Sequence, residues 1–107
     1  MIKTDIATNL INEIEHLLGQ ANELCNSVVM NNTLIQSRLI LLKLQELIVD
    51  TDNDQLMKAF IEFCASFDKY SDEAFIIINE PLFRDYDNFN NRFKEFMSAS
   101  KELRISL

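Results

Sequence analysis

Residues 33–49 read TLIQSRLILLKLQELIV, and this stretch decides how the rest of the chain must be arranged. Leucine, isoleucine and valine occupy nearly every side of the helix that it would form. Its long polar side chains are Gln36, Arg38, Lys43, Gln45 and Glu46. A helix that is apolar almost all round needs neighbours on several sides. We therefore predict a bundle with 33–49 at its centre, in which Leu42 is buried.

The composition favours a purely helical domain. A chain of 107 residues with 48% hydrophobic side chains is one domain by length and can bury a core without cross-links. It contains one glycine and one proline, too few for the turns of a β-sandwich or barrel. The sequence therefore predicts an all-α, compact bundle of four to five helices that spans 1–107 as a single domain, with antiparallel neighbours joined by short turns.

The first helix is predicted over 4–29, because apolar side chains recur there at steps of four and three residues. The seam consists of Leu10, Ile14, Leu17, Ala21, Leu24 and Val28, widened by Ile11, Leu18 and Cys25. Gly19 in its middle costs roughly 1 kcal/mol relative to alanine, unless it allows a close helix crossing. His16, the one histidine, lies beside the seam, where a core-edge position is more typical than a catalytic one.

The central helix is expected to begin at Thr33, after a turn at 31–32, because Thr33 and Gln36 fit the T-x-x-Q capping box. The last acids of the turn at 50–54 are then expected to cap a third helix over 53–69 and to favour its positive N-terminal end. The buried stripe of this third helix is Leu56, Phe60, Phe63, Cys64 and Phe67, with Met57 and Ile61 at its margins.

A short fourth helix is expected over 71–78, with Ser71 as its cap. The apolar run from Phe75 to Ile78 has a β-type composition, but no second strand is available to pair with it. Pro81 ends the helix, because the residue before a proline is pushed out of helical geometry.

The last helix is expected over 87–103, with Asp85 or Asp87 as its cap. Its seam repeats at steps of three and four residues: Tyr86, Phe89, Phe93, Phe96, Ser100 and Leu103. Aromatic side chains at helical spacing are typical of a core. Stacking of nucleobases would need a positive groove, and this chain is too acidic to supply one.

No stretch carries the residues of a known catalytic or cofactor site. Asp50, Asp52 and Asp54 begin like a calcium loop, but Gln55 and Ile61 stand where its glycine and glutamate would be. There is no glycine-rich phosphate loop, no zinc ligand set, and no nucleophile with a histidine and an acid. We therefore expect a protein that is not an enzyme and that uses no metal or cofactor.

The two cysteines, Cys25 and Cys64, follow no metal or redox pattern, and we expect both to be reduced thiols in the core. The chain begins MIKTD and shows no apolar run of signal-peptide or membrane-spanning length. These features predict a cytoplasmic protein.

The negative charge is concentrated in one part of the sequence. Residues 50–87 carry ten acidic and three basic side chains, a net charge of −7, which equals the net charge of the whole chain. Such a field repels nucleic acid and attracts a protein with a basic surface. A solvated face that keeps the protein in solution is the alternative interpretation.

The second half of the chain carries a family resemblance in three places: Phe67-Asp68-x-Tyr70, then EPLFRDYD at 80–87, then a helix with Phe89, Arg92 and Phe93. It resembles the C-terminal half of small acidic helical immunity proteins of the colicin D immunity type. The resemblance implies a helical bundle that binds a bacterial toxin, often over the basic cleft of a tRNA-cutting nuclease. It also implies a set of partner-binding residues: Asp68, Tyr70, Asp72, Glu73, Asp85, Tyr86 and Asp87.

Two classes of function remain open at this point. The first is an inhibitor that covers a basic cleft, either an immunity protein or a phage-encoded inhibitor of a nucleic-acid enzyme. The second is a helical assembly or chaperone protein that oligomerises, with a homodimer as one form, or that binds another helix. The second class is favoured by the apolar excess of 33–49, of 75–78 and of the aromatic seam.

Overall fold

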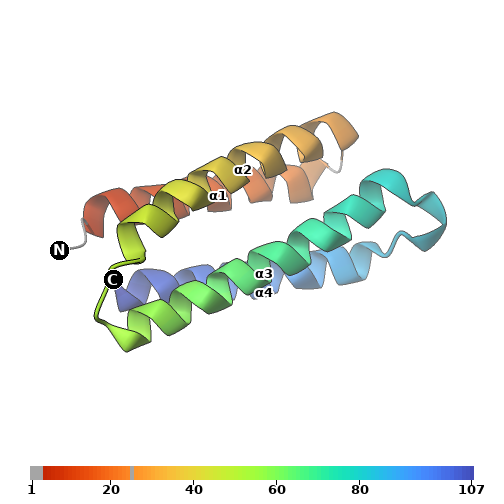
Figure 1. Cartoon of the computed structure of the whole chain (residues 1–107). Helices are drawn as coiled ribbons and strands as arrows, with labels where there is room; N and C mark the ends of the chain where they lie inside the picture. The colour runs from red at the N-terminus through yellow and green to blue at the C-terminus, as the bar shows by residue number, and fades with distance from the viewer. Residues whose placement is uncertain (1–3, 25) are drawn as a thin grey trace.

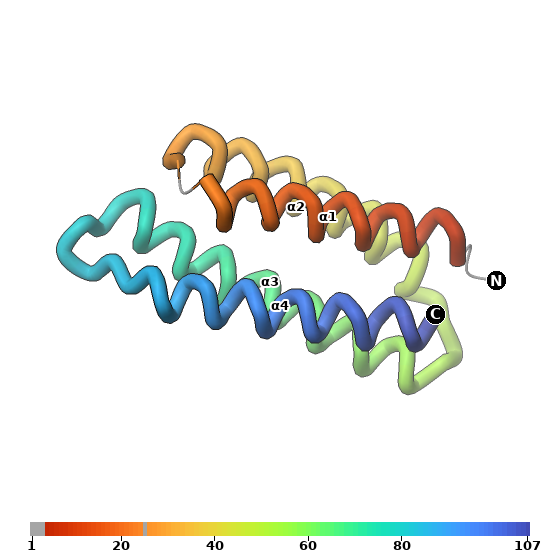
Figure 2. Tube along the Cα trace, turned by 180° about the vertical axis from the view of Figure 1, so that it is seen from behind, coloured from red at the N-terminus to blue at the C-terminus, as the bar shows by residue number. Residues whose placement is uncertain are grey.

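The computed structural model describes residues 4–24 and 26–107, and this part of the chain is all-α (Figure 1). Its elements are α1 (Thr4–Leu24), α2 (Ser27–Ile48), α3 (Asp54–Asn79), the 3₁₀ turn η1 (Pro81–Phe83) and α4 (Tyr86–Ser106). Consecutive helices run antiparallel and are joined by short connections (Figures 1 and 2). The predicted all-α bundle is therefore confirmed.

The bundle consists of two helical hairpins, α1–α2 and α3–α4, laid one against the other (Figure 2). Across the hairpins, α1 adjoins α4 and α2 adjoins α3. The molecule measures 47 × 20 × 17 Å, which is elongated along the helices. Each helix therefore occupies one corner and buries one side, as in other up-and-down bundles.

The prediction that 33–49 lies at the centre is wrong. Its helix, α2, has neighbours on two sides only, so part of its apolar surface faces solvent. The buried residues of α2 are Met30, Thr33, Ser37, Leu44 and Ile48, whereas Ile35, Leu39, Leu42 and Val49 are each more than half exposed. A bundle of four corner helices has no central position for any of them to fill.

The predicted first turn is also wrong, because α2 starts before it. The side-chain oxygen of Asn26 accepts hydrogen bonds from the amides of Val28 and Val29, at 3.0 and 3.3 Å, and so caps α2. Thr33 lies inside the helix, where its hydroxyl donates to the carbonyl of Met30 at 3.1 Å instead of capping. The prediction for Cys25 concerns a residue outside the described part of the chain.

The buried side of α1 is rotated from the predicted seam. It consists of Ala7, Ile11, Ile14, Leu18 and Ala21, so the residues expected to widen the seam are in fact its middle. Leu24 and Val28, at the end of the predicted seam, are exposed. The chain turns between them, and a face that continues smoothly on one helix cannot continue across a turn.

The predicted third and fourth helices are one helix. The cap of α3 is Asn53 and not an acid of the 50–54 turn: its side-chain oxygen accepts a 3.1 Å hydrogen bond from the amide of Leu56. The helix then runs on to Asn79. Ser71 is therefore an interior residue of α3 and not a cap, because no helix begins at this position. The helical assignment of the Phe75–Ile78 run is confirmed, and so is the stop before Pro81.

The predicted cap of the last helix is confirmed for Asp85, whose carboxylate accepts a 2.9 Å hydrogen bond from the amide of Asn88. The aromatic seam is confirmed as core from Phe89 to Leu103, while Tyr86 at its start is nearly half exposed. Rings of α3 and α4 interleave along the hairpin. Phe63 meets Phe96 at 5.1 Å between ring centroids, and Tyr70 stacks on Phe89 at 4.8 Å.

Polar contacts fasten α1 to the α3–α4 hairpin. The Tyr70 hydroxyl donates to the backbone carbonyl of Leu18 at 3.3 Å, inside the core. Nearer the other end, Glu15 forms an ion pair with Arg104 and accepts a 2.6 Å hydrogen bond from the Ser100 hydroxyl. These contacts set the position of α1 over the aromatic seam.

A matched pair of leucines tests the corner position of α2. Leu44→Ala removes a fully buried side chain and is expected to lower the free energy of unfolding by about 2–5 kcal/mol. Leu42→Ala removes a side chain that is 53% exposed and is expected to cost less than about 1 kcal/mol. Chemical denaturation of both variants measures the difference. Equal losses would contradict the arrangement of α2.

Gly19 offers a stabilising substitution. A methyl group at this position would lie 4.0 Å from Cζ of Phe93, which is ordinary van der Waals contact, so the helix crossing does not require glycine. Alanine restricts the unfolded chain and favours the helix. Gly19→Ala is therefore expected to raise the free energy of unfolding by up to about 1 kcal/mol. A loss of stability in thermal and urea unfolding would show that α1 and α4 cannot accept the methyl group.

Candidate protein-binding surfaces

The connection between α3 and α4 projects apolar side chains from one end of the bundle. Its backbone is held close to α3: the Arg84 side chain donates a 2.6 Å hydrogen bond from Nε to the carbonyl of Ile77. A positive side chain at a helix C-terminus also complements the helix dipole. With the chain folded back in this way, Leu82 and Phe83 point away from the core and are 93% and 70% exposed.

Acidic side chains surround these apolar ones. Glu80 lies just before η1, while Asp85 and Asp87 lie at the start of α4, and all three are exposed. Tyr86 stands between the two aspartates and is 47% exposed. We call this surface the acidic tip, and it consists of Glu80, Leu82, Phe83, Asp85, Tyr86 and Asp87. Large exposed apolar side chains that are ringed by charges are typical of a protein-binding surface.

The structure separates the sequence-predicted binding residues into two places. Asp85, Tyr86 and Asp87 share the acidic tip. Asp68 and Asp72 are exposed in the middle of α3. Helical spacing sets them on the same side of α3 as Cys64 and Phe75, which line hollows between α2 and α3. About 100° of rotation per residue sets the next position, Glu73, on another side of α3, where it is half-buried.

Tyr70 cannot be a partner-facing anchor, and that prediction is corrected. Its side chain is fully buried, stacked on Phe89 and bonded through its hydroxyl to the carbonyl of Leu18. Sequence alone could not separate this tyrosine from Tyr86, because both lie on amphipathic helices near acids. The packing of α1 over α3 decides which of the two is covered.

A second apolar surface runs between α2 and α3. Much of it comes from 33–49 and 75–78, the segments whose apolar excess favoured helical assembly in the sequence. It contains two hollows, of about 340 and 260 Å³. The larger is lined by Asn31, Leu34, Ile35, Arg38, Leu39, Leu42, Ser71, Phe75 and Ile78. The smaller is lined by Gln45, Val49, Met57, Phe60, Ile61 and Cys64. We call this surface, together with Asp68 and Asp72 on its α3 edge, the α2–α3 face.

Cys64 lies in the smaller hollow and is half-buried, so it is less enclosed than expected. Burial, and secondarily the negative charge of Asp68, raise the pKa of its thiol to about 11. The thiolate is the nucleophilic form, so a raised pKa makes the side chain unreactive at neutral pH. Cys64 therefore acts as a small apolar side chain of this face.

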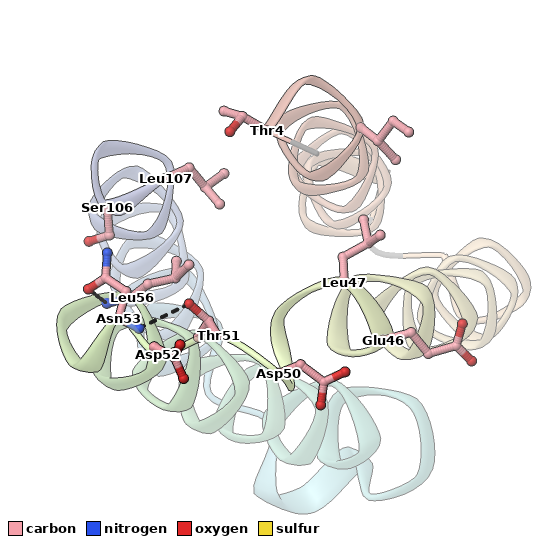
Figure 3. Close-up of a pocket in the computed structure, with 11 residues that line it drawn as sticks. Thr4, Glu46, Leu47, Asp50, Thr51, Asp52, Asn53, Leu56, Ser106 and Leu107 are labelled. Atoms are coloured by element: carbon pink, nitrogen blue, oxygen red, sulfur yellow. Dashed lines mark hydrogen bonds between the residues drawn. The ribbon is translucent and has the colours of Figure 1, made fainter. Parts of the chain in front are cut away.

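The opposite end of the bundle holds a crevice of about 660 Å³ (Figure 3). Asp50 and Asp52 of the calcium-like run line it, and Figure 3 shows that their carboxylates do not converge on one point. A hydrogen bond within the loop links the amide of Asn53 to the Thr51 hydroxyl, which accepts it. Within the described residues, no group of three or more His, Cys, Asp or Glu side chains could hold a metal ion.

His16 is exposed on α1 and not at the edge of the core. Its ring Nε2 lies 3.2 Å from the side-chain amide nitrogen, Nε2, of Gln20, one turn further along the same helix. The polar neighbours of His16 in the shallow groove between α1 and α2 include Asn12, Glu13 and Gln36, and no cysteine or serine lines that groove. This arrangement gives no reason to assign catalysis to the histidine.

Comparison of the chain with protein-family models, with curated proteins and with solved structures gives no significant match. Among the described residues, no helix combines the length and the apolar composition that a membrane crossing needs. The function therefore has to be argued from the acidic tip and the α2–α3 face themselves.

The raised pKa of Cys64 predicts slow thiol chemistry. Between pH 7 and 9 its alkylation by iodoacetamide is expected to be at least about tenfold slower than that of a free thiol, and to accelerate as pH rises toward about 11. The folded protein holds this proton more tightly than the unfolded chain, so the stability it contributes is complete below pH 9 and lost as pH approaches 11. Peptide mapping by mass spectrometry gives the rate at Cys64 itself. Rapid labelling at pH 7 would contradict the described environment.

Proposed function

We propose that this protein is a non-enzymatic, acidic binding protein that inhibits its partner by placing the acidic tip on a basic cleft. The observation that carries the proposal is the tip itself, where Leu82 and Phe83 extend into solvent between three exposed acids. Side chains this exposed contribute little to the stability of the bundle. The tip supplies instead what an interface needs, an apolar centre with a charged rim.

The chemistry of the tip favours a basic partner. Glu80, Asp85 and Asp87 outnumber the one nearby base, Arg84, whose Nε is already bonded to the end of α3. The other acids of 50–87 are spread along α3 and to the opposite end of the bundle, so the field at the tip comes mainly from these three side chains. Acids arranged in this way accelerate association with a basic surface and can occupy the positions of nucleic-acid phosphates.

The resemblance to immunity proteins narrows the class of partner. Its longest matching run, 80–87, is the run that forms η1 and most of the acidic tip. The proposed partner is therefore a bacterial toxin with a nuclease domain, and the proposed role is immunity to that toxin. Arg84 and Pro81 support this role indirectly, because they fix the backbone that presents Leu82 and Phe83.

A second candidate function is helical assembly, either with other copies or with a helix of another protein. The observation that favours it is the α2–α3 face, where Leu39, Leu42 and Phe75 are each more than half exposed. This surface lies along the side of the bundle, whereas the acidic tip lies at its end (Figure 1). The two candidate functions use different residues and can be tested separately.

Charge reversal at the tip tests the inhibitor proposal. Affinity capture with the wild-type protein from the bacterium that encodes it, followed by mass spectrometry, identifies the partner. Glu80→Lys with Asp87→Lys is then expected to slow association by about tenfold or more at low ionic strength, and by less at high salt. Asp85→Asn keeps the cap of α4 while removing a charge, so it extends the series without unfolding the helix.

Two further pairs of substitutions serve as comparisons for these association and dissociation rates. Glu13→Lys with Glu102→Lys changes the net charge equally at exposed positions outside the tip, and is expected to slow association less. Leu82→Ser with Phe83→Ser is expected to raise the dissociation rate by about thirtyfold while leaving the thermal transition unchanged, because both side chains are exposed. A captured partner that binds the Glu80, Asp87 variant and the Leu82, Phe83 variant like wild type would show that the tip is not the binding site.

A further inference from the structure

We propose that the α2–α3 face binds a second copy of this chain, in a twofold-symmetric dimer where α2 of each copy lies on α3 of the other. The proposal rests on the second candidate function, helical assembly, and does not depend on the acidic tip. It identifies the occupant of the face, the geometry of the interface and the residues that set its register.

The face exposes more apolar surface than a bundle corner requires. Six of its side chains are between 53% and 61% exposed: Ile35, Leu39 and Leu42 from α2, Val49 at the C-cap of α2, and Ile61 and Phe75 from α3. They are spread along most of both helices and border the two hollows. Single exposed apolar side chains are normal, but a contiguous set of this kind indicates an interaction surface.

The hollows and the exposed side chains fit a helix-on-helix contact. Each hollow is lined by side chains of both helices, and exposed apolar side chains are among them: Ile35, Leu39, Leu42 and Phe75 in the larger hollow, Val49 and Ile61 in the smaller. In packed helices, a side chain of one helix inserts between the side chains of its neighbour. A second α2–α3 face supplies such side chains, for example Leu39 and Leu42, at the spacing of a helix.

The charges of the face select a second copy over a foreign helix. The α2 side carries the base Arg38, and the α3 side carries the acids Asp68 and Asp72. One surface thus holds both members of a complementary set. A surface that contains its own complement is what an isologous interface between identical chains needs.

The charges also fix the register of the two copies. The Arg38 guanidinium lies 5.5 Å from the centroid of the Phe67 ring, and Arg38 lines the same hollow as Ser71, so it is level with the turn of α3 that holds Asp68 and Asp72. A twofold axis parallel to the helices sets α2 of one copy over α3 of the other at the same level. Each Arg38 then faces the Asp68 and Asp72 carboxylates of the second copy.

The other twofold arrangement is disfavoured by charge. An axis perpendicular to the helices would set α3 against α3 and bring the acidic edges of the two copies, with Asp68 in each, next to one another. Like charges that face each other across an interface oppose association. Only the axis parallel to the helices pairs Arg38 with these acids on both sides of the interface.

Sedimentation analysis of the full chain tests the proposal, from about 10 µM to about 1 mM, a range in which a weak dimer forms. Wild type is expected to form dimers, and Leu42→Asp is expected to weaken dimerisation by at least about thirtyfold with an unchanged helical circular dichroism spectrum. Ile105→Asp is the matched control, because Ile105 is 66% exposed on α4, and it is expected to leave the dimer intact. A wild-type protein that stays monomeric throughout, with or without a foreign helix bound, would overturn the proposal.

A charge exchange tests the register. Arg38→Glu alone and Asp68→Lys with Asp72→Lys alone are each expected to weaken self-association about tenfold or more, and an equimolar mixture of the two is expected to form a heterodimer of wild-type affinity. A mixture that stays as weak as its components would overturn the proposed arrangement. Glu80→Lys with Asp87→Lys is expected to dimerise like wild type. The sedimentation result therefore tests the dimer proposal separately from the proposal that the acidic tip binds a basic partner.

Discussion

Tyr70 is the side chain on which the arrangement of the two hairpins depends. Its ring stacks on Phe89 and lies 6.0 Å from Phe93, which holds α3 to α4. Its hydroxyl donates to the carbonyl of Leu18, which holds α1 over the same seam. A buried tyrosine is stable only when its hydroxyl has a partner. The position of α1 is therefore coupled to the packing of the aromatic hairpin.

The two contacts between the hairpins differ in kind. On the α1–α4 side, Glu15, Ser100 and Arg104 form a polar network that crosses between the helices and is partly shielded from water. On the α2–α3 side, the Arg38 guanidinium lies over the Phe67 ring, and apolar side chains of both helices line the hollows between them. One side of the bundle is thus fastened by directional bonds, while the other presents apolar side chains and hollows. This asymmetry is why an interaction surface is inferred on the second side.

The acidic tip has a separate structural origin. Pro81 follows the end of α3, the Arg84 side chain donates a hydrogen bond to the carbonyl of Ile77, and Asp85 caps α4. The residues between them therefore lie outside the core. The same local chemistry that closes the hairpin therefore exposes Leu82 and Phe83. Because hydrogen bonds hold the backbone at both ends of this connection, the proposed interface would form at a low cost in conformational entropy. Binding at the tip and assembly along the side can then occur on one molecule.

Some of this molecule follows from sequence alone, because it depends on local chemistry. The scarcity of glycine and proline indicated helices, Pro81 ended α3, Asp85 capped α4, and the spacing of Phe89, Phe93 and Phe96 indicated a buried seam. Each of these features is set by residues within one or two turns. Within 80–87, the family resemblance implied Asp85, Tyr86 and Asp87 as binding residues, whereas the exposure of Leu82 and Phe83 became visible only in the structure.

The tertiary structure decided the rest, because burial depends on which helices are neighbours. The helix α2 begins at Asn26 and not at the turn at 31–32, although the sequence offers capping residues at both places. The apolar pattern of 33–49 predicted a central helix, yet this helix occupies a corner of the bundle and has two neighbouring helices. The sequence of an apolar helix does not show whether its contacts lie within the same chain or on another molecule. Tyr70 and Tyr86 look alike in sequence, but only Tyr70 is covered by α1. The sequence determined which segments are helical and amphipathic, whereas the packing of four helices determined which apolar side chains remained exposed.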